Sequence, residues 1–350
     1  MLNTSAGPID INMMKNRLTD CPDIDMKQIY IEGRHEAYFV YITDQVDKDI
    51  VQRDFMKPVL DMSLEQLSDQ KHVSNLPCCE IKFIYDTEEA LNEIIIGSIL
   101  LVSEKLPYAI SYKNIKLEKR NVEEPISEKN LRGPHEGFIE ILDANLSILR
   151  RKIHSEKLKF KTLTLGSTTR QKVAIAYIDG IANYDIVNDL YEKISKLNLD
   201  GPIEIGYICQ NIISHPNSLF PQFLTTERPD KATSALLEGR IVVTMEGTPV
   251  VLIAPVTFIS FFQAVDDYST LWVLGSFMRF VRMLGALVVA VFLPAFYIAI
   301  TSFHYYTVPL PLLITLAESR SKVPFPPIIE VLILEFMVEL IREAAIRLPT

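Results

Sequence analysis

Four charged side chains near the end of the chain are spaced so that they would form one stripe on a helix. Glu335, Glu339, Arg342 and Glu343 lie at i, i+4, i+7 and i+8 within the otherwise largely apolar segment 328–348, which predicts an amphipathic helix. Carboxylates that line a water-filled path through a membrane favour cations, so these four are candidate channel-lining residues. The alternative is the solvated face of a helix that lies in the membrane interface.

The segment 271–303 is predicted to span a membrane. Its core, Met283 to Phe303, has no charged side chain and would be about 30 Å long as a helix, which matches the hydrocarbon thickness of a bilayer. Arg279 and Arg282 share one face just before this core. Because cytoplasmic membrane edges are enriched in basic residues, both arginines are interpreted as membrane-edge residues. Pro294 predicts a kink in the helix.

The segment 250–265 is expected to enter the membrane region without crossing it. It is largely apolar, but it is shorter than a span and contains Pro255, so a re-entrant or interfacial segment is the preferred interpretation. The sequence therefore predicts three parts. Residues 1–125 and 126–249 form an α/β region of two related subdomains, and residues 250–350 form an α-helical membrane region.

The two subdomains are expected to be related because the order of their elements returns. Tyr41-Ile42 aligns with Tyr177-Ile178, each in a run of aromatic and β-branched residues typical of a buried strand. Farther along, Gly97 aligns with Gly239, each between a helix-like and a strand-like segment. Agreement of separate blocks in the same order favours an internal repeat over chance similarity.

The chain has no motif that indicates catalysis. P-loop, GxGxxG, GxSxG and HExxH patterns do not occur, and neither the six histidines nor the four cysteines show ligand spacing. We therefore predict no catalytic residue, no cofactor and no metal site. The net charge of −9 argues against a nucleic-acid partner. Adjacent Cys78 and Cys79 and the lack of an apolar leader favour a cytoplasmic amino-terminal region.

Two charged clusters have structural explanations. Arg150, Arg151 and Lys152 lie in the last turn of a predicted helix, where cations favour the helix dipole, so helix termination is preferred over a ligand site. The segment 225–230 precedes another predicted helix, which begins near a proline and ends before Gly239. This second cluster is interpreted as a helix start rather than an active site.

Several short motifs, none specific alone, together point to one known family. They are Arg132-Gly133-Pro134 to Phe138, Asn145 with Leu149-Arg150-Arg151, Tyr177 to Ala182, Thr226 to Asp230, Leu236 to Arg240, Val251 to Pro255 and Val323 to Pro326. With these motifs the chain resembles the A subunits of bacterial spore germinant receptors, the GerA family. The resemblance is strong over about residues 120–350 and looser before them.

The resemblance implies a subunit of a nutrient receptor in the inner membrane of the spore, in contact with membrane lipid. Family members work with two partner subunits, called B and C, and are thought to form nutrient-gated, ion-conducting homo-oligomers that trigger germination. They continue beyond the segment that matches Ile341 to Pro349, whereas this chain ends at Thr350, so we expect a fragment or a truncated product. A membrane-anchored α/β enzyme and a structural scaffold are the alternatives.

Overall fold

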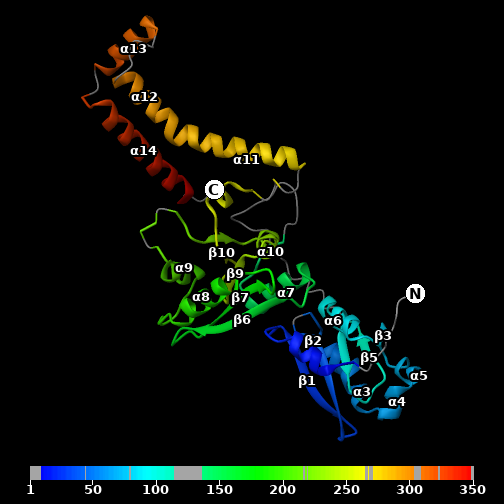
Figure 1. Ribbon diagram of the computed structural model, residues 1–350. Coiled ribbons are helices and arrows are strands. Elements are labelled where there is room, and N and C mark those ends of the chain that lie inside the picture. Colours follow the sequence, from blue (N-terminus) through cyan, green and yellow to red (C-terminus); the bar gives the residue numbers. More distant parts are fainter. Residues whose placement is uncertain are drawn as a thin grey trace. The chain divides into compact units, whose positions relative to one another are not determined.

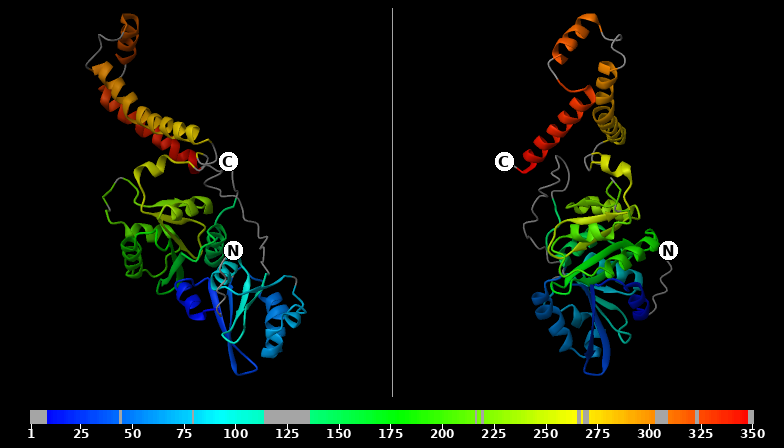
Figure 2. Two further views of the ribbon diagram at one scale, coloured as in Figure 1. Left: turned by 45° about the vertical axis from the view of Figure 1, so that its right-hand side comes forward. Right: turned by 90° about the vertical axis from the view of Figure 1, so that its left-hand side faces the viewer.

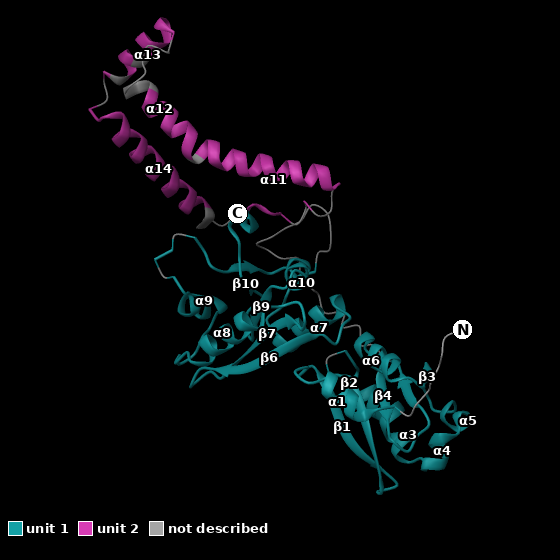
Figure 3. Ribbon diagram, in the orientation of Figure 1, with its two compact units in different colours: residues 1–261 teal, residues 262–350 magenta. Residues whose placement is uncertain are grey.

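The computed structural model has two compact units, residues 1–261 and residues 262–350, called unit 1 and unit 2 below (Figure 3). The structure describes residues 9–43, 45–78, 80–113, 136–215, 217–218, 220–264, 267, 271–302, 309–321 and 324–347. The boundary predicted after residue 125 lies outside the described residues, as do the motif residues Arg132-Gly133-Pro134 and Val323.

Unit 1 contains two five-stranded antiparallel sheets with the same strand order (Figure 1). The first sheet has the order β1-β2-β4-β5-β3, with strands Ile24–Ile31, His35–Ile42, Ile99–Val102, Ala109–Tyr112 and Ile81–Ile84. The second has the order β6-β7-β9-β10-β8, with strands Leu158–Leu165, Gln171–Ile178, Ile241–Met245, Val251–Ala254 and Leu224–Thr226. Because equivalent strands occupy equivalent positions, the predicted internal repeat is confirmed.

Helices cover both faces of the first sheet. One face packs against α1 (Ile11–Arg17) and α6 (Thr87–Ile96). The other packs against α2, the π-helical segment η1, α3, α4 and α5, which are Lys48–Val51, Gln52–Met56, Lys57–Leu60, Leu64–Ser68 and Gln70–Val73. Neighbouring residues of a strand point to opposite faces, so Phe39 joins one hydrophobic core and Val40 the other.

The second sheet is covered in the same way. Its two cores lie under α7 (Leu142–Lys152) with α10 (Pro229–Leu237), and under α8 (Tyr184–Ser195) with α9 (Ile205–Ile212). From Val173 onward, strand β7 is buried on both faces, which explains why this part of its sequence is continuously apolar rather than alternating. Each sheet therefore has a hydrophobic core on either side, and a fragment that contains unit 1 is expected to fold by itself.

Two parts of the sequence-based interpretation change in unit 1. Val251–Ala254 is strand β10, buried and paired with β8 and β9, so the expected re-entrant segment over 250–265 is wrong for these residues. In the part of this segment that is described, up to residue 264, β10 is followed by the short 3₁₀ turn η2 (Phe258–Phe262). The edge strands β1 and β6 were not expected, because their outer residues are polar and exposed and so lack the apolar run of a central strand.

Unit 2 is helical. The predicted span over 271–303 is divided into α11 (Trp272–Leu287), the π-helical segment η4 (Val288–Phe292) and α12 (Leu293–Ser302), which Figure 2 shows as a bent rod. Within the described part of the chain, no helix combines the length and the apolar character needed to cross a membrane.

Two further helices complete unit 2. They are α13 (Leu310–Arg320) and α14 (Pro327–Arg347), and α14 agrees in extent with the helix predicted over 328–348, as far as its residues are described. Helix α12 contacts α14, and the Tyr297 hydroxyl donates to Glu330 Oε2 at 3.2 Å.

Each π-helical segment ends just before a proline. The N–H of Lys57, before Pro58, donates to the carbonyl of Gln52, and the N–H of Leu293, before Pro294, donates to the carbonyl of Val288. A proline ring collides with the carbonyl four residues earlier in a regular α-helix. The wider turn relieves this collision, and the bend predicted at Pro294 takes this form.

We predict that Gly239→Ala destabilises unit 1 more than Gly247→Ala. Both glycines have left-handed φ angles, +84° and +85°, which cost an alanine about 1–2 kcal/mol. A Cβ at Gly239 would also lie 3.0 Å from the carbonyl oxygen of Ile181, whereas a Cβ at Gly247 would meet nothing. Urea unfolding of a fragment of residues 1–264 measures both losses. Equal losses of stability in the two variants would show that the short distance between a Cβ at position 239 and the Ile181 carbonyl oxygen does not contribute to the cost.

Candidate functional site

The main chain between α1 and β1 is hydrogen-bonded to strand β6 of the second sheet. The Lys159 ammonium donates to the carbonyl oxygens of Arg17 at 2.6 Å and Thr19 at 2.5 Å. These carbonyls lie at the carboxyl end of α1, where a cation is favoured by the helix dipole. The Phe160 N–H donates to the Asp20 carbonyl at 3.0 Å. The segment 17–23 is therefore held by the second subdomain, although it belongs to the first.

A buried ion pair holds the end of the same segment. Arg150, in α7, has a side chain that is 0% exposed, and that of Asp23 is 3% exposed. Arg150 Nε donates to Asp23 Oδ2 at 2.8 Å and Nη2 to Oδ1 at 3.0 Å, while Nη1 donates to the Ser155 carbonyl at 2.7 Å. The guanidinium also lies 5.1 Å from the centre of the Phe160 ring. Such a bidentate, fully hydrogen-bonded pair is the arrangement in which a buried arginine is tolerated.

Helix termination, predicted for the basic cluster at the end of α7, therefore does not explain Arg150. It suits Arg151 and Lys152, which form ion pairs with Glu136 and are more exposed. A further pairing joins the subdomains nearer the surface, where Arg17 binds both Glu88 of α6 and Glu156 just before β6.

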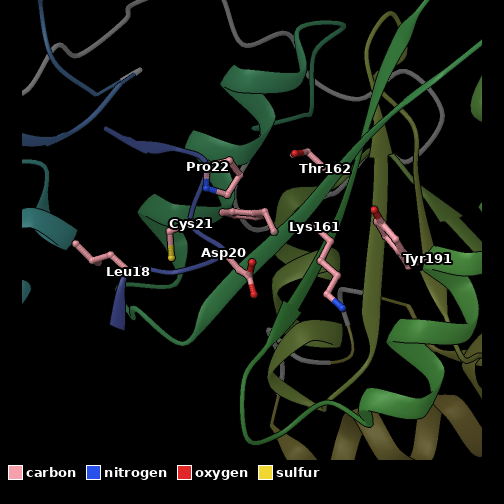
Figure 4. Close-up of a pocket in the computed structure, with 8 residues that line it drawn as sticks. Leu18, Asp20, Cys21, Pro22, Lys161, Thr162 and Tyr191 are labelled. Atoms are coloured by element: carbon pink, nitrogen blue, oxygen red, sulfur yellow. The ribbon is translucent and has the colours of Figure 1, made fainter. Parts of the chain in front are cut away.

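An open cavity of about 560 Å³ lies beside segment 17–23, between it and strand β6 (Figure 4). Its lining residues are Leu18, Asp20, Cys21, Pro22, Phe160, Lys161, Thr162 and Tyr191. Lys161 Nζ donates to Asn188 Oδ1 at 2.9 Å and lies 5.6 Å from the centre of the Tyr191 ring. Among the described residues, Lys161 forms no ion pair. The lining of the cavity thus includes an amine, a carboxyl group and a phenol, from Lys161, Asp20 and Tyr191.

The cysteine that lines the cavity is not an activated nucleophile. Burial raises the pKa of the Cys21 thiol, although Arg150 and Lys159 oppose that rise. A thiol with a raised pKa is mostly protonated near neutral pH, and the protonated form is a poor nucleophile. No group of three or more His, Cys, Asp or Glu side chains in the described ranges could hold a metal ion.

A buried tyrosine lies close to the cavity. Burial, and then the negative charge of Asp20, raise the pKa of Tyr177 to about 12. Tyr41, at the equivalent position of the first sheet, also has a pKa of about 12, because it is buried and its hydroxyl donates to Asp25. Equivalent positions of the two sheets therefore each hold a tyrosine whose hydroxyl has a raised pKa.

The predicted membrane-edge arginines of unit 2 meet at one carboxylate. Arg279 Nε lies 3.2 Å from Asp267 Oδ2, and Arg282 binds both oxygens of Asp267, at 3.1 and 3.2 Å. The two arginines are therefore on one face of α11, as their spacing predicted. Their location at a membrane edge stays a prediction.

The four candidate channel-lining residues lie along one stripe of α14. Glu335, Glu339, Arg342 and Glu343 are all exposed, and Arg342 forms an ion pair with Glu339. With three carboxylates and one guanidinium, the stripe keeps a net negative charge. Whether these side chains line a channel stays a prediction.

Sequence reasoning missed the residues that join the subdomains. Arg150 and Asp23 are 127 positions apart, so no local pattern connects them. One local pattern could have indicated strand β6, which carries Lys159. It is the alternation Leu158-Lys159-Phe160-Lys161, which is typical of a strand with one apolar and one basic face.

We predict that Asp23→Asn lowers the free energy of unfolding of the 1–264 fragment by about 3–5 kcal/mol, because it leaves a buried guanidinium without its counter-charge. In urea unfolding, the double variant Asp23→Leu with Arg150→Met should recover most of this loss, since neither charge remains buried. Arg151→Met, which breaks only an exposed pair, should change stability by less than about 0.5 kcal/mol. Similar losses for Asp23→Asn and Arg151→Met would contradict the role assigned to the buried pair.

We also predict that unit 1 loses stability as the pH rises from about 10 towards 12. In the unfolded chain Tyr177 and Tyr41 ionise near 10, whereas in the folded protein they stay protonated to about 12. The folded state then binds more protons, so raising the pH favours unfolding. Tyrosinate absorbance of the fragment should show late-ionising groups, one of which disappears in Tyr177→Phe. Asp20→Asn should lower the pKa of Tyr177, and an unchanged titration would contradict the influence of the Asp20 charge on this phenol.

Comparison with known proteins places this fold and these residues in a family. The model of the Bacillus/Clostridium GerA spore germination protein family matches residues 12–350. Spore germination protein GerQA of Bacillus cereus is 37% identical over 311 residues, which are 89% of this chain and 62% of that protein. Spore germination protein KA of Bacillus subtilis is 32% identical over 340 residues, 96% of this chain and 62% of that protein. The chain thus spans less than two thirds of the length of these relatives.

The fold of the α/β region has a counterpart among solved structures. The crystal structure of the N-terminal domain of the A subunit of the Bacillus megaterium spore germinant receptor GerK3 matches with a TM-score of 0.50 and 25% sequence identity. The match covers 71% of this chain and 94% of that domain. From the family match and these relatives together, the chain belongs to the Bacillus/Clostridium GerA family of spore germination proteins.

Proposed function

We propose that this chain is the A subunit of a nutrient receptor in the inner membrane of the spore, and that it triggers germination within a nutrient-gated, ion-conducting oligomer. The observation that carries the proposal is the likeness of its α/β region to the N-terminal domain of a germinant receptor A subunit. The family match that continues through unit 2 supports it. In this proposal B and C subunits are the partners, and the amino-terminal region lies in the cytoplasm.

Unit 2 is the part that we place in the membrane. Helix α11 exposes large apolar side chains at successive positions, including Trp272, Val273 and Leu274, and again at Phe277 and Phe280. Successive positions of a helix point in different directions, so this helix is apolar on more than one side. A helix of that kind needs apolar surroundings, and lipid supplies them.

The stripe on α14 is proposed to face an aqueous path at the centre of a homo-oligomer. Charged side chains near the centre of a bilayer cost about 2.5–3.5 kcal/mol each, so an isolated α14 with Glu335, Glu339 and Glu343 facing lipid is unfavourable. Turning the stripes of several copies towards one axis removes that cost. The resulting ring of carboxylates favours cations. The small side chains of Ala344 and Ala345 would permit close helix approach.

Substitutions in the stripe test the proposal. Glu335→Gln and Glu339→Gln should each slow cation release during nutrient-triggered germination and weaken the preference for cations over anions, because each removes one charge per subunit from the path. Glu330→Gln is the matched control. At 3.6 residues per turn, Glu330 lies on the opposite side of α14, where it accepts a hydrogen bond from Tyr297.

The measurement is ion release from spores that contain the variant in the full-length protein, or from liposomes with the partner subunits. Assembly with these subunits is checked in parallel by co-purification. Normal release and selectivity in both stripe variants would refute the pore, and the solvated face of an interfacial helix would then explain the stripe.

A further inference from the structure

Unit 1 has an exposed apolar patch, made of Phe220, Phe258, Ile259 and Phe261, which we call the aromatic patch. These side chains are 61%, 55%, 60% and 39% exposed. Phe220 comes from the segment between α9 and β8, and the other three belong to η2. The rings of Phe220 and Phe258 meet edge to face with their centres 5.3 Å apart, so two segments distant in sequence form one surface. Clustered exposed phenylalanines are unusual in water and indicate an interaction surface.

The turn η2 is held so that its apolar side chains point outward. Ser260 is 3% exposed, and its hydroxyl is hydrogen-bonded to Arg240 Nη1 at 3.1 Å and to the Thr257 hydroxyl at 2.8 Å. Since the polar residue of the turn is anchored inside, Phe258, Ile259 and Phe261 are left at the surface. Their exposure therefore results from hydrogen bonds that fix the turn.

The first subdomain does not cover the aromatic patch. In the order β6-β7-β9-β10-β8, the edge strand β6 contacts the segment 17–23. The patch belongs to the other end of this sheet, because η2 follows β10 and the Phe220 segment leads into β8.

We propose that the aromatic patch seats unit 1 on the surface of a lipid bilayer, with its phenyl rings and Ile259 inserted at the level of the headgroups and upper acyl chains. The inference rests on the proposed membrane location of unit 2. The chain passes directly from Phe261 into unit 2, where α11 exposes apolar residues on more than one side. A surface that adjoins such a segment in the chain is kept close to the same lipid. Phenylalanine is also among the apolar side chains with which interfacial segments enter the boundary between headgroups and acyl chains.

Charge argues for insertion rather than electrostatic attraction. The chain has a formal net charge of −9, so anionic headgroups would not attract it as a whole. Binding should therefore persist at high salt and should not require anionic lipid, because burial of apolar area is insensitive to screening.

The test uses the 1–264 fragment, which contains unit 1 and all of η2. The only tryptophan of the chain is Trp272, outside this fragment, so Phe258→Trp introduces a single fluorescent reporter. Addition of phosphatidylcholine vesicles should shift its emission to shorter wavelength, and lipids brominated on their acyl chains should quench it, at low and high salt alike.

Partitioning of unlabelled variants measures the contribution of the patch. Phe258→Ser with Phe261→Ser should lower vesicle binding in co-sedimentation by at least about tenfold, because two phenyl groups no longer leave water. Tyr30→Ser is the matched control, since Tyr30 is 57% exposed but lies on β1 of the first sheet. It should bind vesicles as the unaltered fragment does. Circular dichroism checks that each variant is folded.

Several outcomes would overturn the inference. One is the absence of an emission shift or of quenching, and another is equal binding by the double-serine variant and the unaltered fragment. Binding restricted to anionic vesicles at low salt would replace insertion by electrostatic attraction. Self-association without lipid that the serine variants abolish would assign the patch to contacts between copies.

Because the fragment lacks α14, none of these results decides the proposed ion path, and the Glu339→Gln experiment does not decide the patch.

Discussion

The buried pair of Arg150 and Asp23 is the interaction on which the arrangement of unit 1 depends. Both charges are removed from water, so each is tolerated only because the other is present. Asp23 lies just before β1, and Arg150 lies in α7 of the second subdomain, so the pair fixes the start of the first sheet against the second. Lys159 adds a charged contact at the end of α1. The cavity in Figure 4 is bounded by the segment that these two cations hold.

The duplication of the α/β fold gives equivalent positions equivalent physical properties. Gly97 and Gly239 both adopt left-handed φ angles after a helix, and Tyr41 and Tyr177 both have a strongly raised pKa. The two copies differ where they meet. Strand β6 contributes Lys159 and Phe160 to the contact with segment 17–23, whereas no described residue pairs with the outer edge of its counterpart β1. The repeat thus supplies two similar subdomains. Charged residues of the second subdomain hold them together through hydrogen bonds and ion pairs with the segment 17–23 of the first.

Unit 2 shows how charged groups are accommodated beside apolar surface. Asp267 binds Arg279 and Arg282, and Glu339 binds Arg342, so several of its ionised groups have a partner of opposite sign. The π-helical turn before Pro294 keeps the main chain hydrogen-bonded through a residue that cannot donate. Ion pairing matters most in a region of low polarity, where an unpaired charge is costly, whereas the π-helical turn also occurs before Pro58 in unit 1 and is a general response to proline. The ion pairs are consistent with the membrane location that we propose for this unit.

By itself, the sequence determined features that depend on residues close together in the chain. Spacing predicted the helix of α14 and its stripe, the order of similar blocks predicted the repeat, and Gly239 marked the end of a helix. Tertiary structure decided what depends on distant partners. The apolar run Val251–Ala254 is equally typical of a buried strand and of an interfacial segment, and only its pairing with β8 and β9 settles the question. Arg150 was interpreted as a helix-terminating cation because its buried partner, Asp23, is 127 positions away in the sequence. Local periodicity indicates secondary structure where the pattern is unambiguous, but which strands pair and which side chains share a desolvated site is determined only by the packing of the whole chain.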